Sequence, residues 1–255
     1  MVPVWLTVIA WIYLAVCFCC AAVIAADIVL GGRRQPMGVM NLVFPITALY
    51  FGPLALAFYW RWARVPARAP AVSPAAAPAM AGHGEPATAR GTSAAGHADG
   101  GNGQRRPGWV SMAMEVSHCG AGCTLGDVIA EFAIFWLALS IAGVTLGAEY
   151  LGDYLLALAF GIVFQYFAIA PMRGLGLRDG LVAATKADFI SLTAFEVGLF
   201  GWMALFQLVL FTGPSALMPD SAAYWLLMQA GMMIGFATSW PANVWLVRKG
   251  IKVPM

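Results

Sequence analysis

Six stretches of the chain are apolar over about the 20 residues that a helix needs to cross a bilayer. They cover roughly residues 4–29, 38–60, 125–147, 153–171, 188–211 and 222–247. These runs predict an all-α fold, a polytopic transmembrane helical bundle of about six spans. Pro45 and Pro53 lie inside the second stretch, so we expect that helix to be kinked or partly re-entrant.

A segment of different composition separates the second stretch from the third. Residues 61–108 are rich in Ala, Pro, Gly and Ser and show no apolar periodicity. Such a segment buries too little apolar surface to offset its ordering entropy, which predicts a disordered linker. The chain therefore divides into an N-terminal two-segment membrane region at 1–60, the linker at 61–108, and a four-span membrane domain at 109–255.

The composition agrees with a membrane protein and excludes two other classes. Hydrophobic residues make up 61% of the chain and charged residues 10%, whereas a soluble domain carries roughly 25% charged residues. A soluble chain of 255 residues could not hide so much apolar surface in one core. The net charge of +2 is too small to indicate a nucleic-acid partner.

The positions of Lys and Arg predict the orientation, because short cytoplasmic loops carry an excess of both. Basic residues gather in the linker, after the fourth stretch and at the C-terminus, where they include Arg173, Arg178, Lys186, Arg248, Lys249 and Lys252. The opposite loops carry Glu149, Asp153 and Asp220 and no basic residue. We therefore expect a multi-pass protein whose linker and C-terminus are cytoplasmic.

Arg33 and Arg34 do not fit this orientation if all six stretches cross the bilayer. Six full spans would place both residues outside, which the rule disfavours. Either the N-terminus is outside and the second stretch is a hairpin, or this loop is an exception. The sequence leaves the two alternatives open.

The candidate chemistry is concentrated between residues 112 and 131. His118, Cys119 and Cys123 supply an imidazole and two thiols within six residues, donors that suit Cu(I) and Zn(II). Gly120 and Gly122 loosen the backbone and would let both sulfurs turn toward one metal ion. In a helix, Cys119, Cys123, Asp127 and Glu131 would instead form a stripe at four-residue spacing. The alternative without chemistry is a glycine-rich turn whose thiols pack as small hydrophobes.

Acidic residues within the spans are the second signal. Glu196 lies in the middle of the fifth stretch and Glu131 in the first turns of the third. Carboxylates at membrane depth face the bundle interior or a water-filled path, so we expect Asp127, Glu131 and Glu196 to line an ion or proton pathway. Lys186 and Asp188 would lie at its cytoplasmic mouth, where interfacial snorkelling also explains them.

Several segments resemble a bacterial membrane-protein family catalogued only as a domain of unknown function, number 4396. They read SHCGAGCTLGD, GIVFQYFAIAPMRGL, KADFISLTAFEVG and NVWLVRKGIK, all within 109–255, with MNLVFPITALYFGP at 40–53. The resemblance implies a multi-span bundle in the bacterial inner membrane, whose characteristic segments contain His118, Cys119, Cys123, Asp127, Lys186, Asp188 and Glu196. It implies no reaction, substrate or cofactor.

The leading functional hypothesis is binding, and transport or sensing, of a soft metal cation. Copper fits the donors best and zinc is the second choice. The alternatives are a thiol-disulfide oxidoreductase that uses Cys119 and Cys123, and a non-catalytic structural subunit. Nucleotide-binding and common hydrolase motifs are missing, which favours a role other than an enzyme. The expected partners are the lipid bilayer and a small cation or proton; homo-oligomerisation is left open.

Overall fold

The computed structural model describes residues 2–66, 107–173 and 176–252, and most of the predicted linker lies outside them. The described part is helical, without a strand, as the all-α prediction requires. The long helices are α1 (Val4–Val29), α4 (Gly108–Leu137), α5 (Thr145–Arg173), α6 (Leu177–Leu205) and α7 (Ala222–Arg248). The shorter elements are α2 (Met40–Phe51), α3 (Pro53–Phe58), the π-helical turns η1 (Tyr59–Ala63) and η2 (Phe206–Leu210), and the 3₁₀ turn η3 (Gly213–Ser215).

Four helical segments are long and apolar enough to cross a membrane, by length and composition. They are Val4–Val29, Gly108–Leu137, Thr145–Ala168 and Asp188–Leu210. Large apolar side chains cover their outer faces, as Trp5, Trp11 and Phe18 do on α1. Such a surface is favourable against lipid and unfavourable against water. The predicted number of about six full spans is not confirmed.

Helix α4 differs most from the predicted boundaries. The third apolar stretch was expected at 125–147, but α4 runs from Gly108 to Leu137 and residues 138–144 form a turn. The turn contains Ala138 and Ala142 at positive φ, 50° and 52°. Hydropathy misplaced the helix because the polar and glycine-rich half, 115–127, is buried against other helices and faces no lipid. The His-Cys segment is therefore helical, which was one of its two predicted alternatives.

Glycines let α4 approach α5 closely. A Cβ atom on Gly122 would lie 2.9 Å from the Cα atom of Gly161, and one on Gly126 would overlap the backbone at Ala157. Backbone atoms cannot move aside as the end of a side chain can. Small residues of this kind are the usual means by which membrane helices pack tightly, because lipid provides no hydrophobic drive between helices.

The second apolar stretch forms a helical hairpin. It breaks at Gly52, whose φ of 52° suits glycine, and it returns to the end of the bundle from which it started. Gln35 precedes the hairpin, and its side-chain amide donates to the carbonyl of Ala63 at 3.0 Å, just after the hairpin. Helix α2 has 12 residues and is therefore only about 18 Å long, too short to cross a bilayer.

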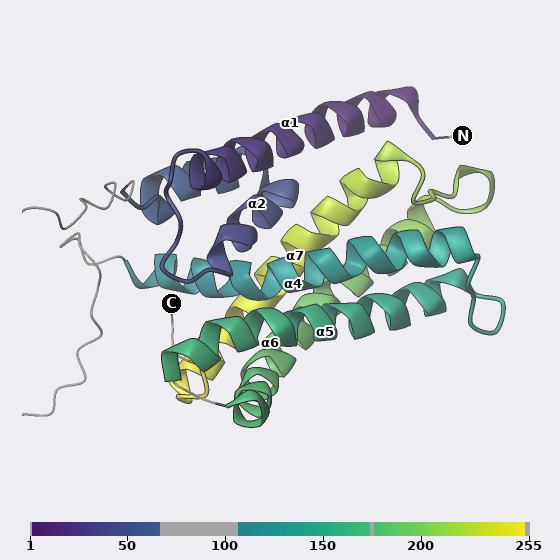
Figure 1. Ribbon diagram of the computed structural model, residues 1–255. Coiled ribbons are helices and arrows are strands. Elements are labelled where there is room, and N and C mark those ends of the chain that lie inside the picture. Colours follow the sequence, from purple (N-terminus) through teal and green to yellow (C-terminus); the bar gives the residue numbers. More distant parts are fainter. Residues whose placement is uncertain (1, 67–106, 174–175, 253–255) are drawn as a thin grey trace, which may run out of the picture.

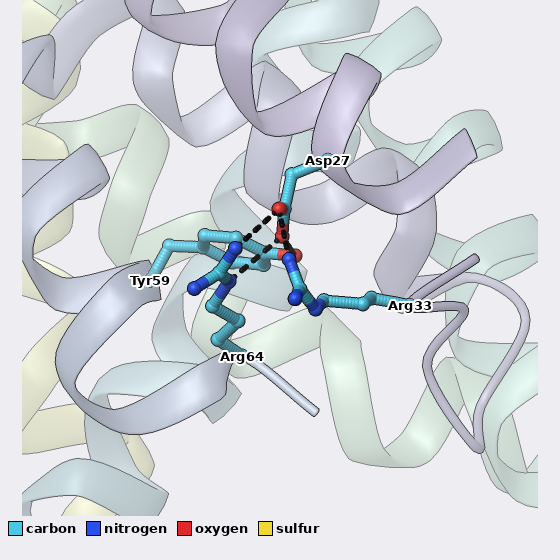
Figure 2. A network of polar contacts seen from close by, with 4 residues as sticks. All are labelled: Asp27, Arg33, Tyr59 and Arg64. Carbon is cyan, nitrogen blue, oxygen red and sulfur yellow. Dashed lines mark hydrogen bonds and ion pairs between the residues drawn. The ribbon is translucent and has the colours of Figure 1, made fainter. Parts of the chain in front are cut away.

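Asp27 at the end of α1 joins the two ends of this hairpin (Figure 2). It accepts hydrogen bonds from Arg33 at 2.5 Å, from Arg64 at 2.7 Å and from the Tyr59 hydroxyl at 3.0 Å. Arg33 precedes α2 and Arg64 follows η1, so the loop that enters the hairpin and the one that leaves it lie together. Of the two sequence alternatives for Arg33, the structure therefore has the hairpin.

The tip of the hairpin is held inside the bundle. Its broken backbone leaves carbonyl groups without helical partners, and side chains from α1 and α7 satisfy two of them. The Tyr13 hydroxyl donates to the Tyr50 carbonyl at 2.9 Å, and the Gln229 amide donates to the Leu49 carbonyl at 2.5 Å. The tip is thus fixed next to α4, where the candidate site lies.

The two ends of the bundle differ in the chain segments they carry (Figure 1). One end, called the basic end below, carries the Arg33 loop, the end of η1, the start of α4, the end of α5, the start of α6 and the residues that directly follow α7. The opposite end carries the N-terminus, the 138–144 turn and the α6–α7 connection. Described basic residues such as Arg33, Arg64, Arg178 and Lys249 therefore share one end.

Candidate functional site

A line of five buried side chains runs along α4 at four-residue spacing. Glu115, Cys119, Cys123, Asp127 and Glu131, called the α4 stripe below, are each at most 1% exposed. Sixteen residues separate the first from the last, which is roughly 24 Å at the rise of an α-helix. The hydrocarbon core of a bilayer is about 30 Å thick, so the stripe extends over most of that distance.

The stripe meets different neighbours along its length, because residues four apart are rotated by about 40° around the helix. Near the basic end it faces the start of α6 and the residues after α7. In the middle it faces α6 and the tip of the hairpin. Near the opposite end it faces α5 and the start of α7. Each part of the stripe therefore forms its own polar group, and the three groups are described in turn.

The middle group joins the two thiols of the stripe to Glu196 of α6. The Cys123 thiol lies beside the Cys119 thiol and the Glu196 carboxyl group, and Asp127 lies near Glu196. Neither oxygen of Asp127 meets a hydrogen-bond donor among the described residues. The Tyr50 hydroxyl of the hairpin tip packs here, 3.0 Å from the position that a Cβ on Gly120 would take. A larger residue at Gly120 would push the tip away.

The group at the opposite end contains three carboxyl groups. Glu131 accepts a hydrogen bond of 2.5 Å from the Tyr224 hydroxyl of α7, and Asp153 of α5 lies beside it. Glu149, one turn before Asp153, accepts a hydrogen bond of 2.8 Å from Gln207. Two neighbouring carboxyl groups away from water cannot both remain ionised without a cation. Glu131 and Asp153 must therefore hold a proton or a cation between them.

The group at the basic end contains an ammonium ion. The Lys252 Nζ atom lies 2.9 Å from Glu115 Oε1 and 3.7 Å from Asp188 Oδ1. Burial lowers the pKa of Lys252, but the negative charges of Glu115 and Asp188 outweigh that effect and raise the pKa above that of a free lysine. The ammonium therefore stays charged at neutral pH.

Acidic groups far outnumber basic ones in the interior. Lys252 and His118 are the buried basic side chains of the described residues. Among these same described residues, seven carboxyl groups are buried, namely Glu115, Asp127, Glu131, Glu149, Asp153, Asp188 and Glu196. A buried carboxylate without a partner is too costly to persist. Most of these seven groups must therefore carry a proton or a bound cation.

The structure brings together most of the residues that the sequence singled out. Asp127, Glu131 and Glu196 face the same interior as Cys119 and Cys123. His118 belongs to another face of α4, where its ring meets Phe164 edge-on with centroids 6.2 Å apart. Over the described ranges, no group of three or more His, Cys, Asp or Glu side chains is placed to hold a metal ion.

The two residues predicted for the cytoplasmic mouth separate. Lys186 is exposed, whereas Asp188 is fully buried and pairs with Lys252. The pairing partner of Asp188 thus comes from 64 positions further along the chain, a distance over which sequence spacing gives no information.

Four buried residues of the three polar groups were not predicted as site residues from the sequence, namely Glu115, Glu149, Asp153 and Lys252. The prediction that Glu149 and Asp153 lie in a loop was wrong, because α5 begins at Thr145 and buries both. Glu115 was detectable, since it extends the predicted stripe by one four-residue step. Lys252 gave no signal beyond its positive charge.

Comparison with protein families finds a match. The family model described as Domain of unknown function (DUF4396) matches residues 108–252, more than half of the chain and all of α4 to α7. No curated protein matches, and no solved structure matches.

Proposed function

The chain belongs to the family described as Domain of unknown function (DUF4396), and since that description names no activity, we propose one from the buried polar groups. The protein is a gradient-driven membrane protein that moves protons along the α4 stripe. The observation that carries the proposal is that the described part of the chain buries seven carboxyl groups and one ammonium group. Groups that must be protonated inside a bundle are the usual components of a proton relay.

The arrangement favours protons over larger ions. A proton needs only neighbouring groups that give and accept it, whereas a metal ion needs several ligands turned toward one point. The side chains proposed to pass the proton lie near one another and are called the proton line below. They are Cys119, Cys123, Glu196, Asp127, Glu131 and Asp153. The sequence contains no nucleotide-binding motif, which leaves an ion gradient or a partner ATPase as the driving force, and the proposal takes the gradient.

The proposed topology has five crossings and one re-entrant hairpin. Helices α1, α4, α5, α6 and α7 cross the membrane, with the basic end in the cytoplasm and the N-terminus outside. The hairpin enters from the cytoplasmic side and places its tip beside Cys119 and Cys123. Broken helices of this kind border the ion sites of many transporters, because irregular backbone at membrane depth must be enclosed by protein.

Proton flux into proteoliposomes tests the proposal. With a pH-sensitive dye inside and an imposed potassium diffusion potential, the wild-type protein is expected to acidify the lumen faster than protein-free vesicles do. Asp127→Asn and Glu196→Gln should reduce the rate to that of protein-free vesicles. Asp179→Asn, which changes an exposed carboxylate at the start of α6, is the matched control and should keep the wild-type rate. Equal rates for all of these samples would exclude proton movement along this line.

Soft-metal binding is the second proposal, and the contact between the two thiols supports it. Cys119 and Cys123 are buried free thiols that lie side by side, and Cys123 lies beside Glu196. A rotation of these side chains would offer a metal ion two sulfurs and a carboxylate. Elemental analysis of the purified protein beside Cys119→Ser/Cys123→Ser tests it. Copper or zinc near one equivalent in the wild type alone would support the proposal. If neither protein held copper or zinc after anaerobic reconstitution, metal binding would be excluded. The thiol-disulfide alternative would then be tested next.

A further inference from the structure

Three oxygen atoms from three helices converge on the ammonium group of Lys252 at the basic end. Glu115 Oε1 of α4 and Asn243 Oδ1 of α7 each lie 2.9 Å from Nζ, and Asp188 Oδ1 of α6 lies 3.7 Å away. The side chains of Lys252, Glu115 and Asp188 are each 1% exposed. The ammonium thus has oxygen ligands on several sides and is closed off from solvent.

One of the three oxygen atoms, Asn243 Oδ1, is held in place by bonds that do not involve Lys252. Asn243 donates from Nδ2 to the Ser191 hydroxyl at 2.6 Å and to the Ser239 carbonyl at 3.0 Å, so its Oδ1 atom points to the ammonium. The carboxylate oxygens of Glu115 and Asp188 have no hydrogen-bond partner among the described residues, and the Lys252 ammonium is the positive charge beside them. The Asn243 amide therefore presents a fixed acceptor, and the two buried carboxylates beside it require a cation.

Lys252 reaches this group from outside the helices. It follows the end of α7 at Arg248, and the backbone between them turns at Gly250, whose φ is 69°. Glycine at this position makes the turn accessible without strain. A lysine side chain has four flexible carbon atoms and a compact charge, which suits an occupant that can enter and leave.

We infer that Glu115, Asp188 and Asn243 form a binding site for a small monovalent cation, which Lys252 fills as a tethered occupant. The two carboxylates and the amide oxygen are the ligand types that hard cations prefer. When the segment after α7 moves away, a free ammonium or alkali-metal ion would take the place of the lysine ammonium, because two buried carboxylates cannot remain uncompensated.

The site lies at the cytoplasmic end of the proposed proton line, so this inference deepens the proposed function. The idea that protons enter at this site rests on the proposed function, because a cation bound there would block the proton line next to Cys119. The binding site itself does not depend on transport. A binding experiment therefore separates the two proposals.

Chemical rescue tests the site directly. The Lys252→Ala variant, purified in detergent, is expected to unfold at a lower temperature than the wild type. Methylammonium chloride should raise the transition temperature of the variant saturably, whereas choline chloride at equal ionic strength should not, because choline is too large to fit between the three oxygen atoms. The wild type should not respond, since its own ammonium fills the site. Lys249→Ala, which removes an exposed charge three positions away, should behave as the wild type does.

A second substitution identifies the ligands. In Glu115→Gln/Lys252→Ala the apparent affinity for methylammonium should fall at least about tenfold. Equal stabilisation of this variant and of Lys252→Ala would overturn the inference, as would the absence of any methylammonium effect in Lys252→Ala. If Lys252→Ala is not recovered folded, Asp188→Asn/Lys252→Ala replaces it, because one carboxylate then balances one cation. No methylammonium effect in that variant would also overturn the site.

The outcomes distinguish the two proposals. Methylammonium rescue without proton flux in the wild-type protein would retain the cation site and reject proton movement. Proton flux that depends on Asp127, without methylammonium rescue, would retain the proton line and reject the cation site.

Discussion

At the scale of single residues, Asp27 illustrates how one ionised group organises segments that are far apart in the sequence. Its carboxylate receives hydrogen bonds from residues on both sides of the hairpin, Arg33 and Arg64, and from Tyr59 (Figure 2). The arginine side chains remain partly exposed, 27% and 39%, so water screens these ion pairs in part. The network therefore gives moderate stability and, above all, fixes the ends of the hairpin next to each other.

Replacing Asp27 should release the ends of the hairpin. Asp27→Asn removes the negative charge but keeps the shape of the side chain, and we expect the free energy of unfolding to fall by about 1–2 kcal/mol. The loss should shrink as salt is added, because salt weakens the ion pairs of the wild type as well. Thermal unfolding in detergent at low and high salt measures both effects.

Arg34 provides the control for this network. It is exposed and forms no ion pair within the described part of the chain, so Arg34→Ala should change the stability by less than about 0.5 kcal/mol. Arg33→Ala should resemble Asp27→Asn in direction. If Arg33→Ala and Arg34→Ala were equally harmless, the network would not hold the hairpin.

At the scale of helices, α4 serves both the candidate site and the packing of the bundle. It carries the polar stripe, and on the side of α5 it carries glycines that allow contact between the backbones. The close approach brings Asp153 of α5 next to Glu131 of α4. Packing and the candidate site therefore depend on the same interface.

Widening that interface should destabilise the fold and separate the carboxyl groups. Gly122→Val would place a side chain against the backbone of Gly161, and we expect a loss of about 1–3 kcal/mol, the usual effect of overpacking. Thermal unfolding and the proton-flux rate should both decrease. The matched change Gly201→Ala on α6, where a Cβ meets no atom within 4 Å, should leave the stability unchanged or raise it by up to about 1 kcal/mol. A harmless Gly122→Val would contradict the close packing.

At the scale of the whole molecule, the helical hairpin formed by α2, α3 and η1 explains where Arg33 and Arg34 lie. Because α2, α3 and η1 return to the end from which they started, Arg33 and Arg34 share the basic end with the other described cationic segments (Figure 1). Six full spans would have put these two residues on the opposite side. The proposed topology thus satisfies the positive-inside rule without exceptions.

Labelling of single cysteines with a membrane-impermeant maleimide tests this topology. In a background without the five native cysteines, Ser140→Cys and Thr212→Cys should react in intact cells, because both positions are exposed at the end opposite to the basic end. Arg34→Cys and Asp179→Cys should react only after the membrane is permeabilised. Reaction of Arg34→Cys in intact cells would show that the second apolar stretch crosses the membrane completely.

The sequence by itself determined the class of fold and the ends of several helices. The run at 4–29 matches α1, and the sixth stretch matches α7 within one residue. Apolar length is a local property that does not depend on neighbours, so it could be read directly. The stripe from Cys119 to Glu131 could also be predicted from the four-residue spacing of its members, provided that the segment is helical.

Only the tertiary structure decided which polar residues are buried and which groups they meet. The ends of α4 could not be predicted from hydropathy, because its polar half faces other helices. Glu149 and Asp153, which the sequence predicts in a loop, are buried in α5. The pairs Lys252 with Glu115, Tyr224 with Glu131 and Arg64 with Asp27 join residues far apart in the chain. Such contacts depend on how helices pack, and no local pattern encodes them.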